Sequence, residues 1–188
     1  MELFDEDNKV EISPFPKAIG ESTPYLEYKE GEVIDVLMGE MGVISDNSKF
    51  KYLGTSGLAT CVGVSFWYGN ILTLAHLIAW NDIPYAINLM RSEFPSDAKV
   101  SGRVFNGDPH PSESLIIDIK QILKLSQELG INILSADVFD EQSFGFYISA
   151  QNFSVHKRKE SHIRPLSSYT KNQEYIMDEH VRKIIDNG

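Results

Sequence analysis

Residues 52–81 read YLGTSGLATCVGVSFWYGNILTLAHLIAWN and contain no Asp, Glu, Lys or Arg. About 20 apolar residues suffice to cross a membrane, but glycines, hydroxyl-bearing residues and other polar residues interrupt this stretch throughout. Its β-branched and aromatic runs instead predict two buried strands, Thr60–Tyr68 and Ile71–Trp80, joined by a turn at Gly69-Asn70. Strands without charge on either face indicate a central hairpin in a sheet that is covered on both sides.

The residues after this hairpin alternate between helical and extended patterns. Helices are predicted over Ile83–Phe94, with Asp82 as the N-cap, and over Ser114–Leu129, with Gly130 at the end. Short strands are predicted over residues 100–105, 131–138, 144–148 and 153–156. One more amphipathic helix is predicted over Asn172–Ile185. The sequence therefore predicts an α+β fold with two principal helices and layered strands.

The acidic residues concentrate in the N-terminal part of the chain. Residues 1–50 hold 12 acidic and 4 basic residues, a net charge of −8 out of −10 for all 188 residues. With Pro14, Pro16 and Pro24, this composition predicts an acidic, extended or mobile arm over residues 1–32. A folded domain over residues 33–158 and a partly helical C-terminal extension over residues 159–188 complete the expected organisation.

Composition also excludes several classes of function. An acidic chain is a poor partner for nucleic acid, whose phosphates favour a basic surface. The N-terminus has neither the basic nor the apolar segment of a signal peptide, so we expect a cytoplasmic protein without membrane insertion. A single cysteine excludes a disulfide framework. His110 is expected in a surface loop, and His156, His162 and His180 form no ligand spacing, so no metal is expected.

Cys61 and His76 are the candidate chemical groups, because they lie in the two strands of the predicted hairpin. Counting outward from the turn at Gly69-Asn70 brings them within one diagonal step of each other, on the same face. An imidazolium beside a thiolate is the usual way to make cysteine a nucleophile near neutral pH. The preceding loop, residues 54–60, consists mostly of small and hydroxyl-bearing residues and leaves backbone N–H groups approachable, as an oxyanion hole requires.

A structural interpretation of the same residues stays open. A lone cysteine in an apolar strand is commonly an inert core residue, and a lone histidine in a strand is commonly held by hydrogen bonds. A threonine in the preceding loop, such as Thr55, commonly caps a turn.

The segment Thr55–Val64, TSGLATCVGV, resembles the Thr-x-Gly-Leu-Gly-Ser-Cys-Val segment of the CheD family of chemoreceptor glutamine deamidases. Other segments resemble the family in the same order: residues 36–41 its opening strand, 74–77 its histidine strand, 102–107 its Lys-Val-Phe-Gly-Gly turn, and 130–158 its closing strands. The resemblance covers roughly residues 34–158. It implies a CheD-like layered core, an α/β/β sandwich, between N- and C-terminal extensions. The cytotoxic necrotizing factor toxins are similar only in having a Cys–His pair on a related core.

The resemblance implies that Cys61 is the nucleophile, His76 the base and Thr55 the third polar member. It further implies substrate contacts from Ser56, Thr60, Phe105 and Asn106. The implied reaction converts a protein glutamine to glutamate with release of ammonia through a Cys61 thioester, without a metal or organic cofactor. The implied partners are a protein substrate bearing the glutamine and a regulatory protein of the chemotaxis pathway.

The chain departs from the family pattern at several positions. Ala59 and Thr60 stand where the family has Gly-Ser, and Asn106 replaces the first glycine of Gly-Gly. The long helix also lacks the family's Arg and Asn near its start. Two functions therefore stay open: an amidohydrolase acting on protein glutamine, or also asparagine, in a chemoreceptor or in a host protein after delivery, and a catalytically weak binding module.

Overall fold

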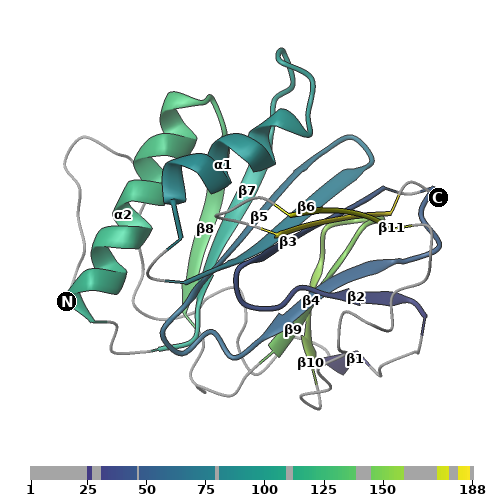
Figure 1. The fold of residues 1–188 in the computed structure, drawn as a ribbon, viewed down its shortest axis with the longest axis horizontal. Coiled ribbons are helices and arrows are strands. Elements are labelled where there is room, and N and C mark those ends of the chain that lie inside the picture. Colours follow the sequence, from purple (N-terminus) through teal and green to yellow (C-terminus); the bar gives the residue numbers. More distant parts are fainter. Residues whose placement is uncertain are drawn as a thin grey trace.

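The computed structural model describes residues 25–26, 31–45, 47–78, 81–108, 112–138, 145–158, 173–177 and 182–186. These segments form an α+β fold with two helices and two mixed sheets (Figure 1). The helices are α1 (Ile83–Ser92) and α2 (Glu113–Glu128). The strands are β1 (Tyr25–Leu26), β2 (Val33–Asp35), β3 (Glu40–Ser45), β4 (Tyr52–Ser56), β5 (Val62–Tyr68), β6 (Ile71–Leu77), β7 (Ser101–Asn106), β8 (Asn132–Val138), β9 (Gly145–Ser149), β10 (Val155–Arg158), β11 (Gln173–Met177) and β12 (Arg182–Asp186). Neither helix in this part of the chain has the length and apolar character needed to cross a membrane.

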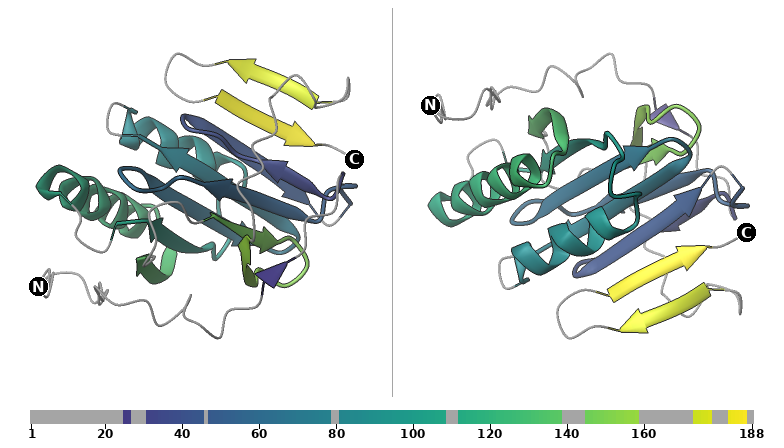
Figure 2. Two further views of the ribbon diagram at one scale, coloured as in Figure 1. Left: turned by 90° about the horizontal axis from the view of Figure 1, so that it is seen from below. Right: turned by 90° about the horizontal axis from the view of Figure 1, so that it is seen from above.

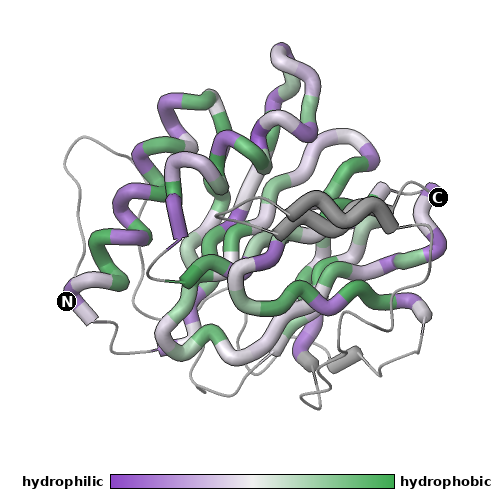
Figure 3. The backbone as a smooth tube through the Cα atoms, viewed as in Figure 1, coloured by the Kyte–Doolittle hydropathy of each residue, from purple (hydrophilic) through white to green (hydrophobic). Residues whose placement is uncertain are grey.

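The elements stack in three layers. A seven-stranded sheet of order β11-β12-β3-β6-β5-β7-β8 lies in the middle, with α1 and α2 on one face (Figures 1 and 2). A five-stranded sheet of order β1-β10-β9-β4-β2 lies against the other face. Two apolar clusters fill the spaces between the layers, one under the helices and one between the sheets. Green, hydrophobic stretches run through the strands of both sheets in Figure 3, in keeping with this burial.

The predicted central hairpin is confirmed. Strands β5 and β6 pair antiparallel from Tyr68↔Ile71 to Val62↔Leu77, around the turn at Gly69-Asn70. Gly69 has φ +59°, a conformation that glycine adopts without the strain of a side chain. Because successive residues alternate between faces, β5 and β6 supply side chains to both apolar clusters.

Both predicted principal helices are also confirmed. Helix α1 begins after Asp82, whose side chain accepts the Tyr85 N–H at 2.9 Å. Helix α2 begins after Ser112 and gives way to Gly130, which has φ +69°. Asp82 and Gly130 match the capping rules from which these ends were predicted, and Ser112 was not predicted as a cap. Strands β7, β8, β9 and β10 lie close to their predicted positions.

Two expectations need correction. The helix predicted over Asn172–Ile185 is wrong, because β11 and β12 occupy this region as an antiparallel pair, and β12 joins β3 in parallel. Within the predicted N-terminal arm the structure describes β1, which pairs with β10; residues 1–24 and 27–30 lie outside the described residues, so the arm stays a prediction. The predicted loop over residues 54–60 begins as strand β4, which runs to Ser56.

Candidate active site

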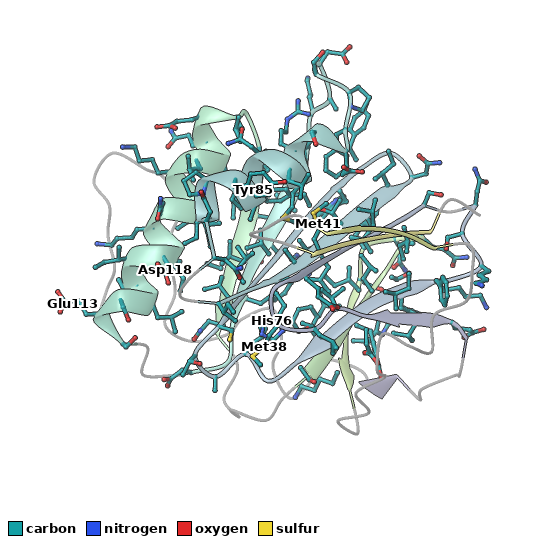
Figure 4. All side chains as sticks on the ribbon, in the orientation of Figure 1. Met38, Met41, His76, Tyr85, Glu113 and Asp118 are labelled. Carbon is teal, nitrogen blue, oxygen red and sulfur yellow. The ribbon has the colours of Figure 1, made fainter. Side chains whose placement is uncertain are left out.

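Thr55 and His76 meet between the two sheets. Thr55 lies in β4 of the smaller sheet, and His76 lies in β6 of the larger sheet (Figure 4). The Thr55 hydroxyl oxygen is 2.8 Å from His76 Nδ1 and 2.8 Å from the Val36 carbonyl oxygen. Both side chains are buried, each with 1% of its surface exposed. The structure therefore joins two of the three residues that the resemblance implies for catalysis.

The Thr55 hydroxyl fixes the tautomer of His76. A carbonyl oxygen can only accept, so the hydroxyl donates its one proton to Val36. For its second contact to be a hydrogen bond, the hydroxyl must accept a proton from His76 Nδ1. Nε2 of the neutral ring then carries the lone pair. This nitrogen is buried and has no hydrogen-bond partner within the described residues, which leaves it available as a base.

Cys61 lies on the same side of the larger sheet as His76. The hairpin register places His76 opposite Gly63, and Cys61 precedes Gly63 by two residues, one residue before β5 begins. Residues two apart in an extended chain share a face. Cys61 belongs to the apolar cluster between the sheets and is 3% exposed. The diagonal relation expected from the sequence is therefore present in the register.

Burial controls the electrostatics of this pair. It lowers the pKa of His76 from 6.5 to about 4, opposed only in part by the nearby Val36 carbonyl. Burial also raises the pKa of the Cys61 thiol, opposed in part by the Thr60 hydroxyl, which lies 3.9 Å from Sγ. The direction for Cys61 corrects the expected thiolate–imidazolium pair. The resting site holds a thiol and a neutral imidazole.

A four-residue turn carries Cys61 into β5. The Leu58 carbonyl accepts the Cys61 N–H at 3.3 Å, with Ala59 and Thr60 at the centre of the turn. Neither central N–H group donates to another residue in the described part of the chain. Two unpaired N–H groups beside a cysteine meet the chemical requirement for binding a developing oxyanion.

The end of β7 holds this turn from the other side. The Asn106 side-chain amide donates to the Cys61 carbonyl at 3.0 Å and accepts the Asp108 N–H at 2.8 Å. The next residue, Gly107, donates its N–H to the Leu58 carbonyl at 3.0 Å. The resemblance implies that Asn106 contacts substrate, but its side chain is 1% exposed and both ends of its amide bind the protein itself.

The other residues expected to contact substrate fall into two groups. Thr60 is exposed, and Ser56, at the end of β4, is partly exposed. Phe105 is buried, with its ring centroid 4.3 Å from that of Phe146 in β9. The structure therefore leaves Ser56 and Thr60 able to meet a ligand and assigns Phe105 to the core.

Two further residues lie next to His76 that were not among the predicted site residues. Glu40 lies directly opposite His76 in the β3–β6 ladder, is 3% exposed, and accepts the Leu37 N–H at 3.1 Å. Met38 is 65% exposed, and the Gly39 N–H after it donates to the His76 carbonyl at 2.8 Å (Figure 4). In the sequence, Glu40 stands out as the one charged residue in the otherwise apolar run of residues 36–44, and this could have marked it as a candidate.

Other histidines and metal ligands add nothing to this site. His156 in β10 pairs its Nε2 with the Ser154 hydroxyl at 2.7 Å. His110, His162 and His180 lie outside the described residues. Among those that are described, no group of three or more His, Cys, Asp or Glu residues could hold a metal ion.

Comparisons with known proteins assign no family. No protein-family model matches the chain, and no curated protein matches it significantly. Among solved structures, the chain is similar to the crystal structure of Bacillus licheniformis hypothetical protein YfiH, with 13% identity and a TM-score of 0.36. The match covers 54% of this chain and 51% of that protein, about half its length. A likeness this distant says nothing about function.

Proposed function

We propose that the protein is a cysteine amidohydrolase that converts protein glutamine side chains to glutamate. The observation that carries the proposal is the Thr55–His76 hydrogen bond, which directs the unshared pair of His76 to Nε2, on the face of the sheet that also holds Cys61. A nucleophile, a base and a group that orients the base are the minimum set for covalent acyl transfer.

The proposed reaction begins with a neutral pair. His76 Nε2 takes the thiol proton as Cys61 Sγ attacks the substrate carboxamide carbon, and the N–H groups of Ala59 and Thr60 bind the oxyanion. The C–N bond then breaks, and the leaving nitrogen takes the proton from Nε2 and departs as ammonia. Water, deprotonated by Nε2, attacks the thioester carbon. The C–S bond breaks, the thiol regains its proton, and a glutamate side chain is released.

The CheD resemblance supports both the reaction and a CheD-like identity for the layered core. On the same resemblance, we propose a protein substrate and a regulatory partner of the chemotaxis type. We also propose that the protein acts in the cytoplasm, or in a host cell after delivery. The exposed Thr60 and the partly exposed Ser56 are then the side chains placed to meet the substrate backbone.

A second candidate function has its own support. Cys61 is 3% exposed and His76 is 1% exposed, and burial raises the pKa of the thiol. These properties favour a catalytically weak module that keeps the fold and binds a partner protein. The two candidates differ in whether Cys61 turns over a carboxamide.

Peptides with one central glutamine, and matched peptides with asparagine in its place, provide the test. Each is incubated with the wild-type protein and with the Cys61→Ala variant, and the products are mapped by mass spectrometry alongside ammonia release. Conversion of glutamine to glutamate by the wild type alone supports the amidohydrolase. Conversion by neither protein, repeated with purified chemoreceptor cytoplasmic domains, favours the binding module.

A further inference from the structure

The backbone of Cys61 lies just beyond the hydrogen-bonded ladder that orders its neighbours. Strand β5 begins at Val62, and the pair Val62↔Asn106 closes the ladder between β5 and β7. Ladder bonds therefore fix Val62 but not the peptide carbonyl of Cys61. A group outside the ladder has to hold this carbonyl for the thiol to keep a defined direction.

Asn106 supplies that group. Its Nδ2 donates to the Cys61 carbonyl at 3.0 Å, and its Oδ1 accepts the Asp108 N–H at 2.8 Å. Because a carbonyl can only accept and an N–H can only donate, these two partners also decide which way the amide faces. The side chain is 1% exposed, so water does not compete for either bond.

Gly107 secures the other end of the same turn. Its N–H donates to the Leu58 carbonyl at 3.0 Å, the same oxygen that accepts the Cys61 N–H at 3.3 Å. A Cβ at position 107 would lie 2.9 Å from the Leu58 carbonyl carbon and 3.2 Å from the Ala59 nitrogen, both backbone atoms. Only glycine lets β7 approach the turn this closely. Asn106 and Gly107 thus hold the turn at Cys61 and at Leu58.

From this arrangement we infer that Asn106 is a positioning residue, which acts through the Cys61 backbone to keep the thiol in register with His76. The inference rests on the proposed function, because it concerns the geometry of the same pair. It replaces the substrate contact that the resemblance implies for Asn106.

The test uses iodoacetamide, which alkylates the thiol and itself carries a carboxamide. The rate of Cys61 alkylation is measured by mass spectrometry with His76 intact and with His76→Ala, in the wild-type background and in the Asn106→Asp background. Asn106→Asp keeps an acceptor for Asp108 but removes the donor to Cys61. The quantity compared is the ratio of the two rates, His76 intact over His76→Ala, within each background.

Positioning predicts a ratio of about tenfold or more in the wild-type background, falling to within about twofold in the Asn106→Asp background. An unchanged ratio would overturn the inference about Asn106. A ratio of one in the wild-type background would instead overturn the Cys61–His76 pair of the proposed function. In that case Asn106 is tested separately, by comparing the alkylation rate of His76→Ala with that of the double variant His76→Ala, Asn106→Asp. A changed rate supports positioning of the Cys61 carbonyl by Asn106, and an unchanged rate contradicts it.

Two controls separate positioning from loss of stability. Asn152→Asp changes an exposed turn asparagine that accepts the Ser154 N–H at 3.1 Å and precedes Phe153, whose ring stacks on Trp67 at the other end of β5 from Cys61; it should leave the ratio unchanged. Leu123→Ala removes a buried side chain under the helices and lowers the melting temperature. If Leu123→Ala reduces the ratio as much as Asn106→Asp does, the effect comes from general destabilisation and the inference is wrong.

Discussion

The two faces of the seven-stranded sheet are both buried but differ in chemistry. Under α1 and α2, the cluster around Val64, Ile87 and Ile122 is apolar, and Thr73 bonds only to the Phe66 carbonyl, at 3.3 Å. Between the sheets, the same strands bury His76 against Thr55, with Glu40 opposite His76 in the ladder. A buried polar group costs stability unless it is paired. Under the proposed function, the helix-side face maintains the fold and the inter-sheet face carries the site.

Removing the base should give the largest effect and should separate the faces most clearly. His76→Ala is expected to lower the turnover of glutamine by ~10³-fold or more, because the Cys61 thiol loses the nitrogen that accepts its proton. His156→Ala, on β10, should leave turnover unchanged. Steady-state ammonia release measures both, and equal losses in the two variants would contradict the assignment of His76.

Removing a side chain from the helix-side core should lower stability and leave turnover unchanged. Ile122 is buried in α2 with no measurable exposure, and Ile122→Ala is expected to cost about 3 kcal/mol in the free energy of unfolding. Turnover per folded molecule should stay close to that of the wild type at low temperature. Urea unfolding and activity are measured on the same sample. A loss of turnover as large as that of His76→Ala would contradict the assignment of stability to one face and turnover to the other.

Acid should weaken the inter-sheet face through His76. Its folded pKa of about 4 lies below the ordinary 6.5, so as pH falls below 6.5 the unfolded chain binds the proton first. Stability therefore drops until the folded ring is protonated near pH 4, by about 3 kcal/mol in total. The contribution is fully present above pH 6.5.

Urea unfolding at about pH 7 and at about pH 4.5, on either side of the ordinary histidine pKa, measures this loss. Carboxyl groups add their own pH dependence, so the quantity of interest is the difference between the wild type and His76→Asn. The variant should lose less stability than the wild type over this interval. An equal loss would mean that His76 keeps its ordinary pKa in the folded protein.

The smallest effect should come from two threonines that differ only in the face they occupy. Thr55→Val is expected to reduce turnover by ~10²-fold, because His76 loses the acceptor that sets its tautomer. Thr73→Val removes an equally buried hydroxyl from the helix side and should leave turnover unchanged. Each change should cost about 1 kcal/mol in stability. If Thr55→Val keeps wild-type turnover, the site reduces to Cys61 and His76.

Local signals in the sequence were enough for the hairpin and both helices. The Gly69-Asn70 turn sets the register of β5 and β6, and Asp82 and Gly130 mark helix ends, all within a few residues of the element concerned. The helix prediction for the C-terminal segment was wrong because β12 pairs with β3, which is far away in sequence. Periodicity within a segment cannot reveal a distant parallel partner, and such a partner overrides helix propensity.

The candidate site was predictable in its members but not in its electrostatics. Hairpin register alone places Cys61 near His76, whereas the hydrogen bond that His76 donates to Thr55 requires a second sheet whose position no local pattern gives. The expected thiolate–imidazolium pair was wrong because sequence spacing reveals a partner but not the burial of both groups. Burial raises the pKa of Cys61 and lowers that of His76. Asn106 was assigned to substrate for a similar reason: its backbone partner is visible only in three dimensions.

The pairing of β12 with β3 has a consequence for the nascent chain on the ribosome. In the register, Arg182 lies beside Glu40, so 142 residues separate these neighbours in sequence (182 minus 40). At roughly 5–20 residues per second, translation takes roughly 7 to 28 seconds to cover that interval. Once β6 has been made, β3 has a partner on one side, and its other edge stays open until β12 follows. An unpaired strand edge invites pairing with other chains, so a new chain that lacks β12 presents β3 as an edge to its neighbours on the same polysome.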